Sequence, residues 1–299
     1  MVPSSMTNTQ LIEEQGISIL LGTYNRKSFL ESTIHSIREE MEPGKIPYEI
    51  IVVDGGSTDG TLPWLMKQRD IITIVQHNHG QWRGKTIERQ SWGYFMNLGF
   101  KAALGKYICM VSDDCLIIPG AITRGYAQFE ECVKREEKVG ALAFFWRNWP
   151  EEKRYFVQNF FGKVNVNHGM YLHKALKEVG YADQDTYRFY AGDVDLIFKL
   201  DQRGYISIAS SNSFIEHFSH ANPFLRTVNM KTMDDDIKSF INKWRQVLPE
   251  YNFTEQNRCH LLESSFIDPD NTVQKWKARM NVKIYLLKRT VSAHLFNLR

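Results

Sequence analysis

Residues 107–120, YICMVSDDCLIIPG, contain a short apolar run that ends in two adjacent acids, Asp113 and Asp114. The run is typical of a buried strand, and a Pro-Gly turn follows a second apolar segment. Buried carboxylates are costly unless they are paired or bind a cation. In open α/β sheets, ligands bind at the carboxyl ends of the strands. The two acids therefore either cap the helix that follows or hold a cation beside a ligand.

Strands and helices alternate on both sides of this run. Apolar, β-branched runs predict the strands, and apolar residues spaced by three and four predict the helices. The predicted strands are 17–22, 48–53, 71–76, 107–111, 139–147 and 205–217, and the predicted helices are 27–40, 86–103, 172–179 and 193–203. This alternation predicts an α/β fold, with a mainly parallel sheet flanked by helices on both faces.

The composition limits the class of protein. A chain of 299 residues is long enough for one large domain, or for one domain with an appendage. Its net charge of +3 does not indicate a nucleic-acid binder. The 4 cysteines form no CxxC pair, which favours reduced thiols in a cytoplasmic protein. We find no signal-peptide pattern at the start and no apolar run of transmembrane length.

A glycine-rich turn, DGGSTDGT, follows the predicted strand 48–53 and begins with Asp54. Glycines let the backbone approach a ligand, and the acid can accept hydrogen bonds from a base or a ribose. The alternative is a tight turn in which Asp54 caps the next helix. A calcium loop requires Glu at its twelfth position, where Leu65 stands. The absence of GxGxxG and GxxxxGK[ST] motifs argues against dinucleotide oxidoreductases and P-loop NTPases.

Three further segments carry polar residues next to predicted strands or helices. In GTYNR (22–26), Tyr24 can stack on a planar base and Arg26 can reach polar groups, although a solvated helix start is the alternative. In AGDVDL (191–196), Asp193 is suited to act as a general base, whereas both acids there are also favourable at a helix N-terminus. FIEHFSH (214–220) ends a strand with two histidines, which are metal ligands only if a metal site is present.

These pieces form an ordered set along the chain: SILLGTYNR, EIIVVDGGSTDGT, KYICMVSDD, VNVNHGMYLHKALKEVGYAD, GDVDLIFKLDQRGY, IEH and FINKW. The set resembles the inverting family 2 glycosyltransferases, which have the GT-A fold, over roughly residues 17–245. The resemblance implies a catalytic domain at 14–222, with a nucleotide-binding half at about 14–120 and an acceptor-side half at about 121–222. A helical C-terminal extension, 223–299, would follow.

The resemblance also implies residue roles. The donor would be a nucleotide-diphosphate-sugar and the acceptor a hydroxyl of a glycan or of a lipid-linked saccharide. Asp193 would be the catalytic base, and Asp114 and His217 would hold Mg²⁺ or Mn²⁺. The expected donor contacts are Thr23, Tyr24, Arg26, Asp54, Lys85, Arg89 and Asp113.

Several positions depart from the family pattern. Ser112 stands where the metal motif usually has its first acid, and Gly192 replaces the Glu that usually precedes the catalytic Asp. Met96 stands where Arg is frequent, so Lys85 or Arg89 would supply that positive charge. The QxxRW signature of processive synthases is absent, which favours a single transfer. A sugar-nucleotide-forming nucleotidyltransferase and an inactive carbohydrate- or nucleotide-binding module are the alternatives.

The last segment, 275–299, contains seven Lys and Arg residues and no acid. Apolar residues spaced by three and four lie between them, which is the pattern of a basic amphipathic helix. Such a helix can lie on an anionic membrane, which predicts peripheral attachment at the inner face. The alternative is that its apolar stripe packs on the catalytic domain or on a second subunit in a homodimer.

Overall fold

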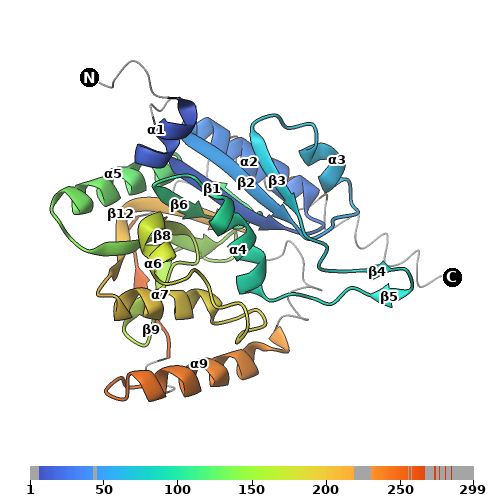
Figure 1. Ribbon diagram of the computed structural model, residues 1–299. Coiled ribbons are helices and arrows are strands. Elements are labelled where there is room, and N and C mark those ends of the chain that lie inside the picture. The colour runs from blue at the N-terminus through green and yellow to red at the C-terminus, as the bar shows by residue number, and fades with distance from the viewer. Residues whose placement is uncertain are drawn as a thin grey trace.

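The computed structural model describes residues 7–42, 46–218, 230–254, 256 and 258–266, together with 273, 276, 280 and 284. Its centre is a sheet in the order β10-β9-β8-β11-β6-β1-β2-β3, with β12, β7 and β13 joined to it (Figure 1). The strands are β1 (Ile17–Thr23), β2 (Tyr48–Asp54), β3 (Ile71–Val75), β4 (Gln81–Trp82), β5 (Lys85–Thr86), β6 (Tyr107–Met110), β7 (Cys115–Ile117), β8 (Val139–Asn148), β9 (Phe156–Phe160), β10 (Lys163–Val164), β11 (Gly169–Leu172), β12 (Ile206–His217) and β13 (His260–Glu263). The helices are α1 (Asn8–Gln15), α2 (Lys27–Met41), α3 (Thr61–Leu65), α4 (Trp92–Ala102), α5 (Ala121–Lys134), α6 (His173–Glu178), α7 (Gly192–Gln202) and α9 (Met233–Val247).

The strands β3, β2, β1 and β6 are parallel neighbours, and β11 runs antiparallel between β6 and β8. Successive residues of a strand point to opposite faces, so a strand covered on both faces is apolar throughout. In β1, Ile19 and Leu21 join a core with α2 and α5, whereas Leu20 joins a core with α4, α6 and α7. This confirms the predicted α/β fold with helices on both faces of the sheet.

The register of the parallel strands brings the polar strand ends together. Thr23 pairs with Asp54 at the ends of β1 and β2, and Leu20 pairs with Met110 near the end of β6. The acids that follow β6 therefore reach the edge where β1 and β2 end. This is the edge at which the sequence predicts a ligand.

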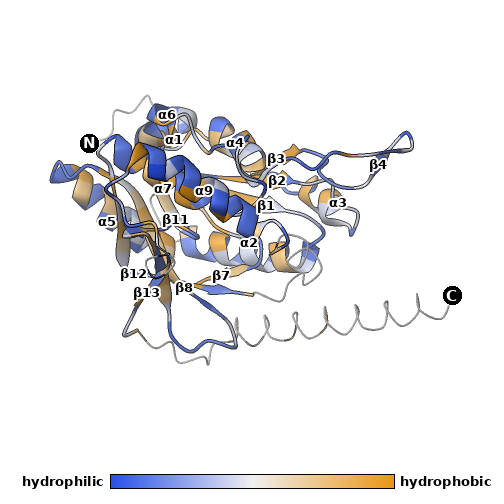
Figure 2. Ribbon diagram, turned by 90° about the horizontal axis from the view of Figure 1, so that it is seen from below, coloured by the Kyte–Doolittle hydropathy of each residue, from blue (hydrophilic) through white to orange (hydrophobic). Residues whose placement is uncertain are grey.

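The predicted helix 86–103 is wrong at its start. Residues 81–86 form the hairpin β4–β5, which projects from the body in Figures 1 and 2. Its two turn residues, Arg83 and Gly84, both have positive φ (49° and 75°), as a two-residue hairpin of type I′ requires. The helix itself begins after Ser91, whose side chain accepts a hydrogen bond from the Tyr94 N–H at 3.0 Å.

The C-terminal extension contains a helix and a strand. Helix α9 lies next to α7 in both ribbon views (Figures 1 and 2). An aromatic cluster that includes Phe198, Phe240 and Trp244 packs the two helices together. Strand β13 pairs antiparallel with β9, so the extension is not wholly helical. Among the described residues, no helix is long and apolar enough to cross a membrane.

The basic tail predicted at 275–299 lies outside the described residues, apart from Trp276, Met280 and Ile284. These three residues are helical and exposed. His220 also lies outside the described residues.

Candidate active-site cleft

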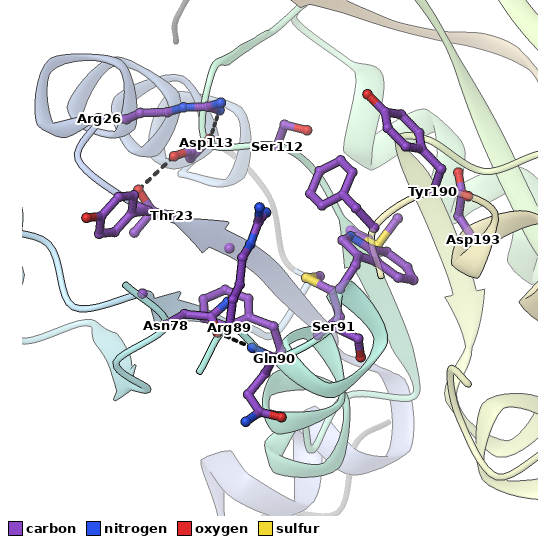
Figure 3. Close-up of a pocket in the computed structure, with 18 of the residues that line it drawn as sticks. Thr23, Arg26, Asn78, Arg89, Gln90, Ser91, Ser112, Asp113, Tyr190 and Asp193 are labelled. Atoms are coloured by element: carbon purple, nitrogen blue, oxygen red, sulfur yellow. Dashed lines mark hydrogen bonds and ion pairs between the residues drawn. The ribbon is translucent and has the colours of Figure 1, made fainter. Parts of the chain in front are cut away.

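A cleft of about 350 Å³ opens at the carboxyl ends of β1, β2 and β6. In Figure 3, Thr23, Arg26 and Asp113 lie on one side of it, Tyr190 and Asp193 lie on the other, and Arg89 lies between them. Its lining includes Thr23, Tyr24, Arg26, Gly55, Asn78, His79, Arg89, Trp92, Asp113, Asn167, Phe189, Tyr190 and Asp193. The cleft therefore brings together predicted residues that are up to 170 positions apart in the sequence.

The first wall of the cleft is built around Asp113. The Thr23 hydroxyl donates to Asp113 Oδ2 at 2.7 Å, and the Arg26 guanidinium donates to Asp113 Oδ1 at 2.7 Å. The same Arg26 nitrogen donates to Asp114 Oδ2 at 2.9 Å. One cation thus serves two adjacent buried acids, which leaves an excess of negative charge when both are ionised.

The two acids differ in their electrostatics. Burial raises the pKa of Asp113 to about 6, with a contribution from the neighbouring Asp114 charge and in spite of Arg26. Burial also opposes ionisation of Asp114, but Arg26 and His217 together hold its pKa below the usual range. The backbone on either side of Asp114 is held by the Thr33 hydroxyl of α2, which donates to the Asp113 and Cys115 carbonyls at 3.0 and 2.7 Å.

Asp114 faces His217 from the end of β12. The distance from Asp114 Oδ1 to His217 Nε2 is 3.4 Å, and Oδ1 is buried with no hydrogen-bond partner. His217 Nδ1 lies 3.0 Å from Asn148 Oδ1, a hydrogen-bond acceptor, so Nδ1 is the donor and Nε2 faces Asp114 Oδ1. Either a hydrogen on His217 Nε2 or a bound cation can therefore bridge this nitrogen and Asp114 Oδ1.

The second half of the chain adds a histidine that the sequence interpretation missed. His168, which follows β10, is buried beside His217, with 5.5 Å between the ring centroids. Burial lowers the pKa of His168 to about 3, so its ring is neutral. Within the described segments, no group of three or more His, Cys, Asp and Glu side chains is arranged to hold a metal ion.

Asp54 is fully buried behind the cleft. Its Oδ1 accepts hydrogen bonds from the Gly56 and Ser57 amides at 2.8 and 2.7 Å, so this acid stabilises the glycine-rich turn and not the helix that follows. Its Oδ2 is buried without a hydrogen-bond partner. Next to this turn, the Tyr24 ring stacks on the His79 ring, with 4.1 Å between the ring centroids. No role for His79 was predicted from the sequence.

The two cations proposed in place of the missing Arg lie in different surroundings. Arg89 lines the cleft, 5.8 Å from the centre of the Phe189 ring, and burial lowers its pKa. Lys85 lies on the exposed hairpin β4–β5 and does not line the cleft. Met96 is buried and also lines the cleft.

The opposite wall carries Asp193 in the first turn of α7. Its Oδ2 accepts a hydrogen bond from Asn165 Nδ2 at 2.8 Å. Burial raises the pKa of Asp193, in spite of that bond. The preceding Ala191 has φ of 65°, a left-handed conformation that is strained for a residue with a Cβ.

Trp92 explains why residue 192 is a glycine. A Cβ at position 192 would lie only 2.8 Å from the Trp92 ring, closer than side-chain carbons approach each other. The indole thus occupies the space beside Asp193 in which a side chain at 192 would lie. Neither Trp92 nor the aromatic pair Phe189 and Tyr190 had been identified from the sequence.

Comparisons with known proteins agree with this architecture. Residues 18–179, more than half of the chain, match the model of glycosyl transferase family 2. The chain is 28% identical over 105 residues to TuaG of Bacillus subtilis (strain 168), a glycosyltransferase named for teichuronic acid biosynthesis. That match covers 33% of this chain and 35% of TuaG, so it spans about a third of the relative.

Solved structures share the fold at low sequence identity. Mannosyltransferase PcManGT from Pyrobaculum calidifontis, solved with GDP-Man and Mn²⁺, gives a TM-score of 0.55 at 16% identity, over 76% of this chain and 64% of that one. S. aureus TarS 1–349 gives 0.51 at 17% identity, over 76% of this chain and 66% of that one. These likenesses confirm the predicted GT-A type fold. With the family model matched over most of the sheet and the first wall of the cleft, the chain belongs to glycosyl transferase family 2.

Proposed function

We propose that this chain transfers a sugar from a nucleotide-diphosphate-sugar to an acceptor hydroxyl, with inversion at the anomeric carbon and with Asp193 as general base. The observation that carries the proposal is the position of Asp193 across the cleft from the wall formed by Thr23, Arg26 and Asp113. A single cleft can thus hold a donor on one wall and present an acceptor to a base on the other.

Asp193 has the properties that the chemistry needs. In a single displacement, the acceptor oxygen attacks the anomeric carbon as the bond to the diphosphate oxygen breaks, and the acceptor proton passes to a carboxylate. A base is most effective when its pKa approaches the working pH, and burial raises the pKa of Asp193 in that direction. The hydrogen bond from Asn165 Nδ2, at 2.8 Å, holds Asp193 Oδ2 in a fixed position at the cleft.

The donor would lie along the strand ends. Gly55 leaves room for the Tyr24 side chain, and Tyr24 and His79, which stack on each other at the cleft, would contact the nucleobase. Asp54 Oδ2 is buried in this turn without a hydrogen-bond partner, which supports a role for this acid in recognising the nucleoside. Arg89, a cation inside the cleft, is placed to contact the diphosphate.

A divalent cation, Mg²⁺ or Mn²⁺, fits Asp114 and His217. In octahedral coordination at 2.0–2.1 Å, adjacent ligand atoms are about 3 Å apart. Asp114 Oδ1 and His217 Nε2 are 3.4 Å apart, and the partnerless Oδ1 has a free lone pair. When bound there, the ion would stabilise the negative charge that grows on the leaving diphosphate. Since the chain supplies two ligands, the remaining ones would come from the donor and water.

One relative supports a class of acceptor. The similarity to a glycosyltransferase named for teichuronic acid biosynthesis supports a glycan, or its lipid-linked precursor, as the acceptor. The absent QxxRW signature favours transfer of one sugar at a time. The family assignment argues against a nucleotidyltransferase, and an inactive binding module is the outcome that the experiment below must exclude.

The experiment is a thermal-shift panel of UDP-, GDP-, dTDP- and CMP-sugars, with and without Mn²⁺, followed by a transfer assay with the donor that stabilises the protein. We expect one nucleotide class to raise the melting temperature, more strongly with Mn²⁺, and the product to have the inverted anomeric configuration by NMR. Binding without transfer or donor hydrolysis would identify an inactive module. A retained configuration would exclude Asp193 as the base of a single displacement.

A further inference from the structure

The loop 187–191 forms the wall of the cleft that faces the donor contacts. It presents Phe189 and Tyr190 to the cleft and leads directly into Asp193. It lies beyond residues 18–179, the part of the chain that the family model matches. Its conformation includes the left-handed Ala191, and such strain persists only where surrounding contacts over-determine the backbone.

Those contacts come from one buried carboxylate on α9. Asp236 is 3% exposed and accepts hydrogen bonds from three consecutive amides of the loop. The Arg188 N–H donates to Oδ1 at 2.8 Å, and the Phe189 and Tyr190 N–H groups donate to Oδ2 at 2.9 Å each. Bonds from N–H groups to a carboxylate are stronger than those between neutral groups.

Helix α9 is itself anchored on α7, the helix that carries Asp193. The buried Asp195 of α7 accepts a hydrogen bond from Trp244 Nε1 at 2.8 Å and pairs with Lys243 Nζ at 2.7 Å. Phe240 and Trp244 also pack against Phe198 of α7. The carboxylate of Asp236 is therefore fixed relative to the base.

The loop is held from its other side by α4. The Trp92 N–H donates to the Arg188 carbonyl at 2.9 Å, so both backbone groups of residue 188 are engaged, one from each side. A simpler role for Asp236 would be to stabilise the N-terminus of α9 by its charge. Asp234 and Asp235 occupy the same turn and are exposed, so that role does not require the burial of Asp236.

We infer that Asp236 is a positioning residue for the acceptor: it fixes the loop 187–191 and thereby places Phe189, Tyr190 and Asp193 around the attacking hydroxyl. This inference rests on the proposed function, in which Asp193 is the general base. It makes α9 part of the acceptor site although α9 does not itself line the cleft.

The test compares Asp236→Ala and Asp236→Asn with the control Asp235→Ala, which removes an exposed acid from the same turn. Three quantities are measured in the full chain: hydrogen exchange of amides 188–190, the Kd of UDP or GDP with Mn²⁺ (whichever stabilises the wild type), and transfer at varied acceptor concentration. We expect Asp236→Ala to speed exchange and to lower kcat/KM for the acceptor by about 10²-fold, as small misplacements do. The nucleotide Kd should change by less than about 10-fold, because Thr23, Tyr24 and Asp113 lie on the other wall and only Arg89, which packs on Phe189, touches the loop. Asp236→Asn, which keeps one acceptor oxygen, should lie between Asp236→Ala and the wild type, and Asp235→Ala should match the wild type.

Two results would overturn the inference. The first is faster hydrogen exchange with normal transfer, which would mean that the loop does not position the acceptor or Asp193. The second is an equal loss of nucleotide binding and transfer in Asp236→Asn, which would mean that Asp236 only supports the fold. If Asp236→Ala does not fold, Asp236→Asn decides by the same criteria. Failure of the proposed function would give a different result, because Asp193→Asn would then retain full turnover. The hydrogen-exchange data would still show whether Asp236 holds the loop.

Discussion

The two walls of the cleft are stabilised in different ways. On the wall that we propose holds the donor (the donor wall), Thr23 ends β1 and Asp113 follows the neighbouring parallel strand β6. The Thr23 hydroxyl oxygen lies 2.7 Å from Asp113 Oδ2. On the wall that we propose faces the acceptor (the acceptor wall), the Tyr190 N–H donates a hydrogen bond to Asp236, 46 positions away on α9. The donor wall therefore depends on the sheet, and the acceptor wall depends on a few polar contacts between segments remote in sequence.

This contrast predicts different responses to mutation. A change on the donor wall should alter ligand binding while the backbone stays in place. A change to a residue that holds the acceptor wall should alter catalysis from a distance.

The largest effect is expected for Asp193→Asn. The amide keeps the size of the side chain but cannot take a proton, and general base catalysis typically contributes about 10²–10⁴-fold. We expect turnover to fall by that factor and the nucleotide Kd to stay unchanged, as measured by a transfer assay and by titration of the nucleotide. Asp185→Asn, at an exposed acid of the preceding loop, is the control. Loss of nucleotide binding in Asp193→Asn would place this residue on the donor wall.

Asp114→Asn should act on binding. The substitution removes an anionic oxygen from the proposed pair of metal ligands, Asp114 and His217. We expect the Mn²⁺ concentration needed for nucleotide binding to rise by more than about 10-fold, because loss of even an indirect metal contact typically lowers metal affinity by about 10-fold or more. The fold should survive, which circular dichroism would check. Unchanged Mn²⁺ dependence would show that Asp114 is not a metal ligand.

Gly93→Ala tests the junction between the walls. A Cβ at Gly93 of α4 would lie 2.1 Å from the Asp183 carbonyl oxygen, a backbone atom of the segment that leads to the loop 187–191. We expect a loss of about 1–3 kcal/mol in the free energy of unfolding, as for other overpacked sites, together with slower transfer. The comparison is Gly99→Ala, whose Cβ would meet the end of the Leu20 side chain at 2.1 Å. That variant should lose stability and keep its catalytic rate per folded molecule.

The pH dependence of transfer should report on the acceptor wall. A general base works when deprotonated, so the rate should rise with pH through the pKa of Asp193, which burial raises. Asn165 favours the charged carboxylate by donating to it at 2.8 Å. Asn165→Ala should therefore move the acidic limb of the pH–rate profile to higher pH. A limb that stays in place would assign it to another group.

The smallest effect is expected from the tail. If the segment 275–299 attaches the protein to an anionic membrane, the full chain should co-sediment with anionic vesicles and a 1–270 variant should not, while transfer to a soluble acceptor stays the same. Trp276 and Ile284, which are exposed, would provide the apolar contact. Equal sedimentation of both proteins would exclude the tail as an anchor.

The donor wall was largely predictable from the sequence because its residues directly follow apolar strands, and parallel strands align their carboxyl ends. Thr23, Arg26 and Asp113, which the sequence predicts as ligand contacts, all line the cleft. Lys85 was misplaced because the helix pattern was extended through a hairpin whose turn, Arg83-Gly84, is a short local signal.

The acceptor wall was predicted only at Asp193. Nothing in the pattern around Asp236 distinguishes it from Asp234 and Asp235, because only the packing of α9 on α7 selects which acid faces the loop. His168 lies in a quoted motif, VNVNHG, but its proximity to His217 arises from the pairing of β8 with both β11 and β12. Such side-chain encounters across the sheet have no local sequence signature.

The contact between Trp92 and Gly192 restricts the order in which mutations can accumulate beside the base. A side chain introduced at 192 first would meet the indole ring at 2.8 Å, so that single step is blocked. A smaller residue introduced at 92 first opens a void that a later change at 192 can fill. The effects of changes at the two positions should therefore depend on each other. A library that varies residue 192 alone should recover mainly glycine, whereas one that varies both positions together can reach new shapes of the cleft beside Asp193.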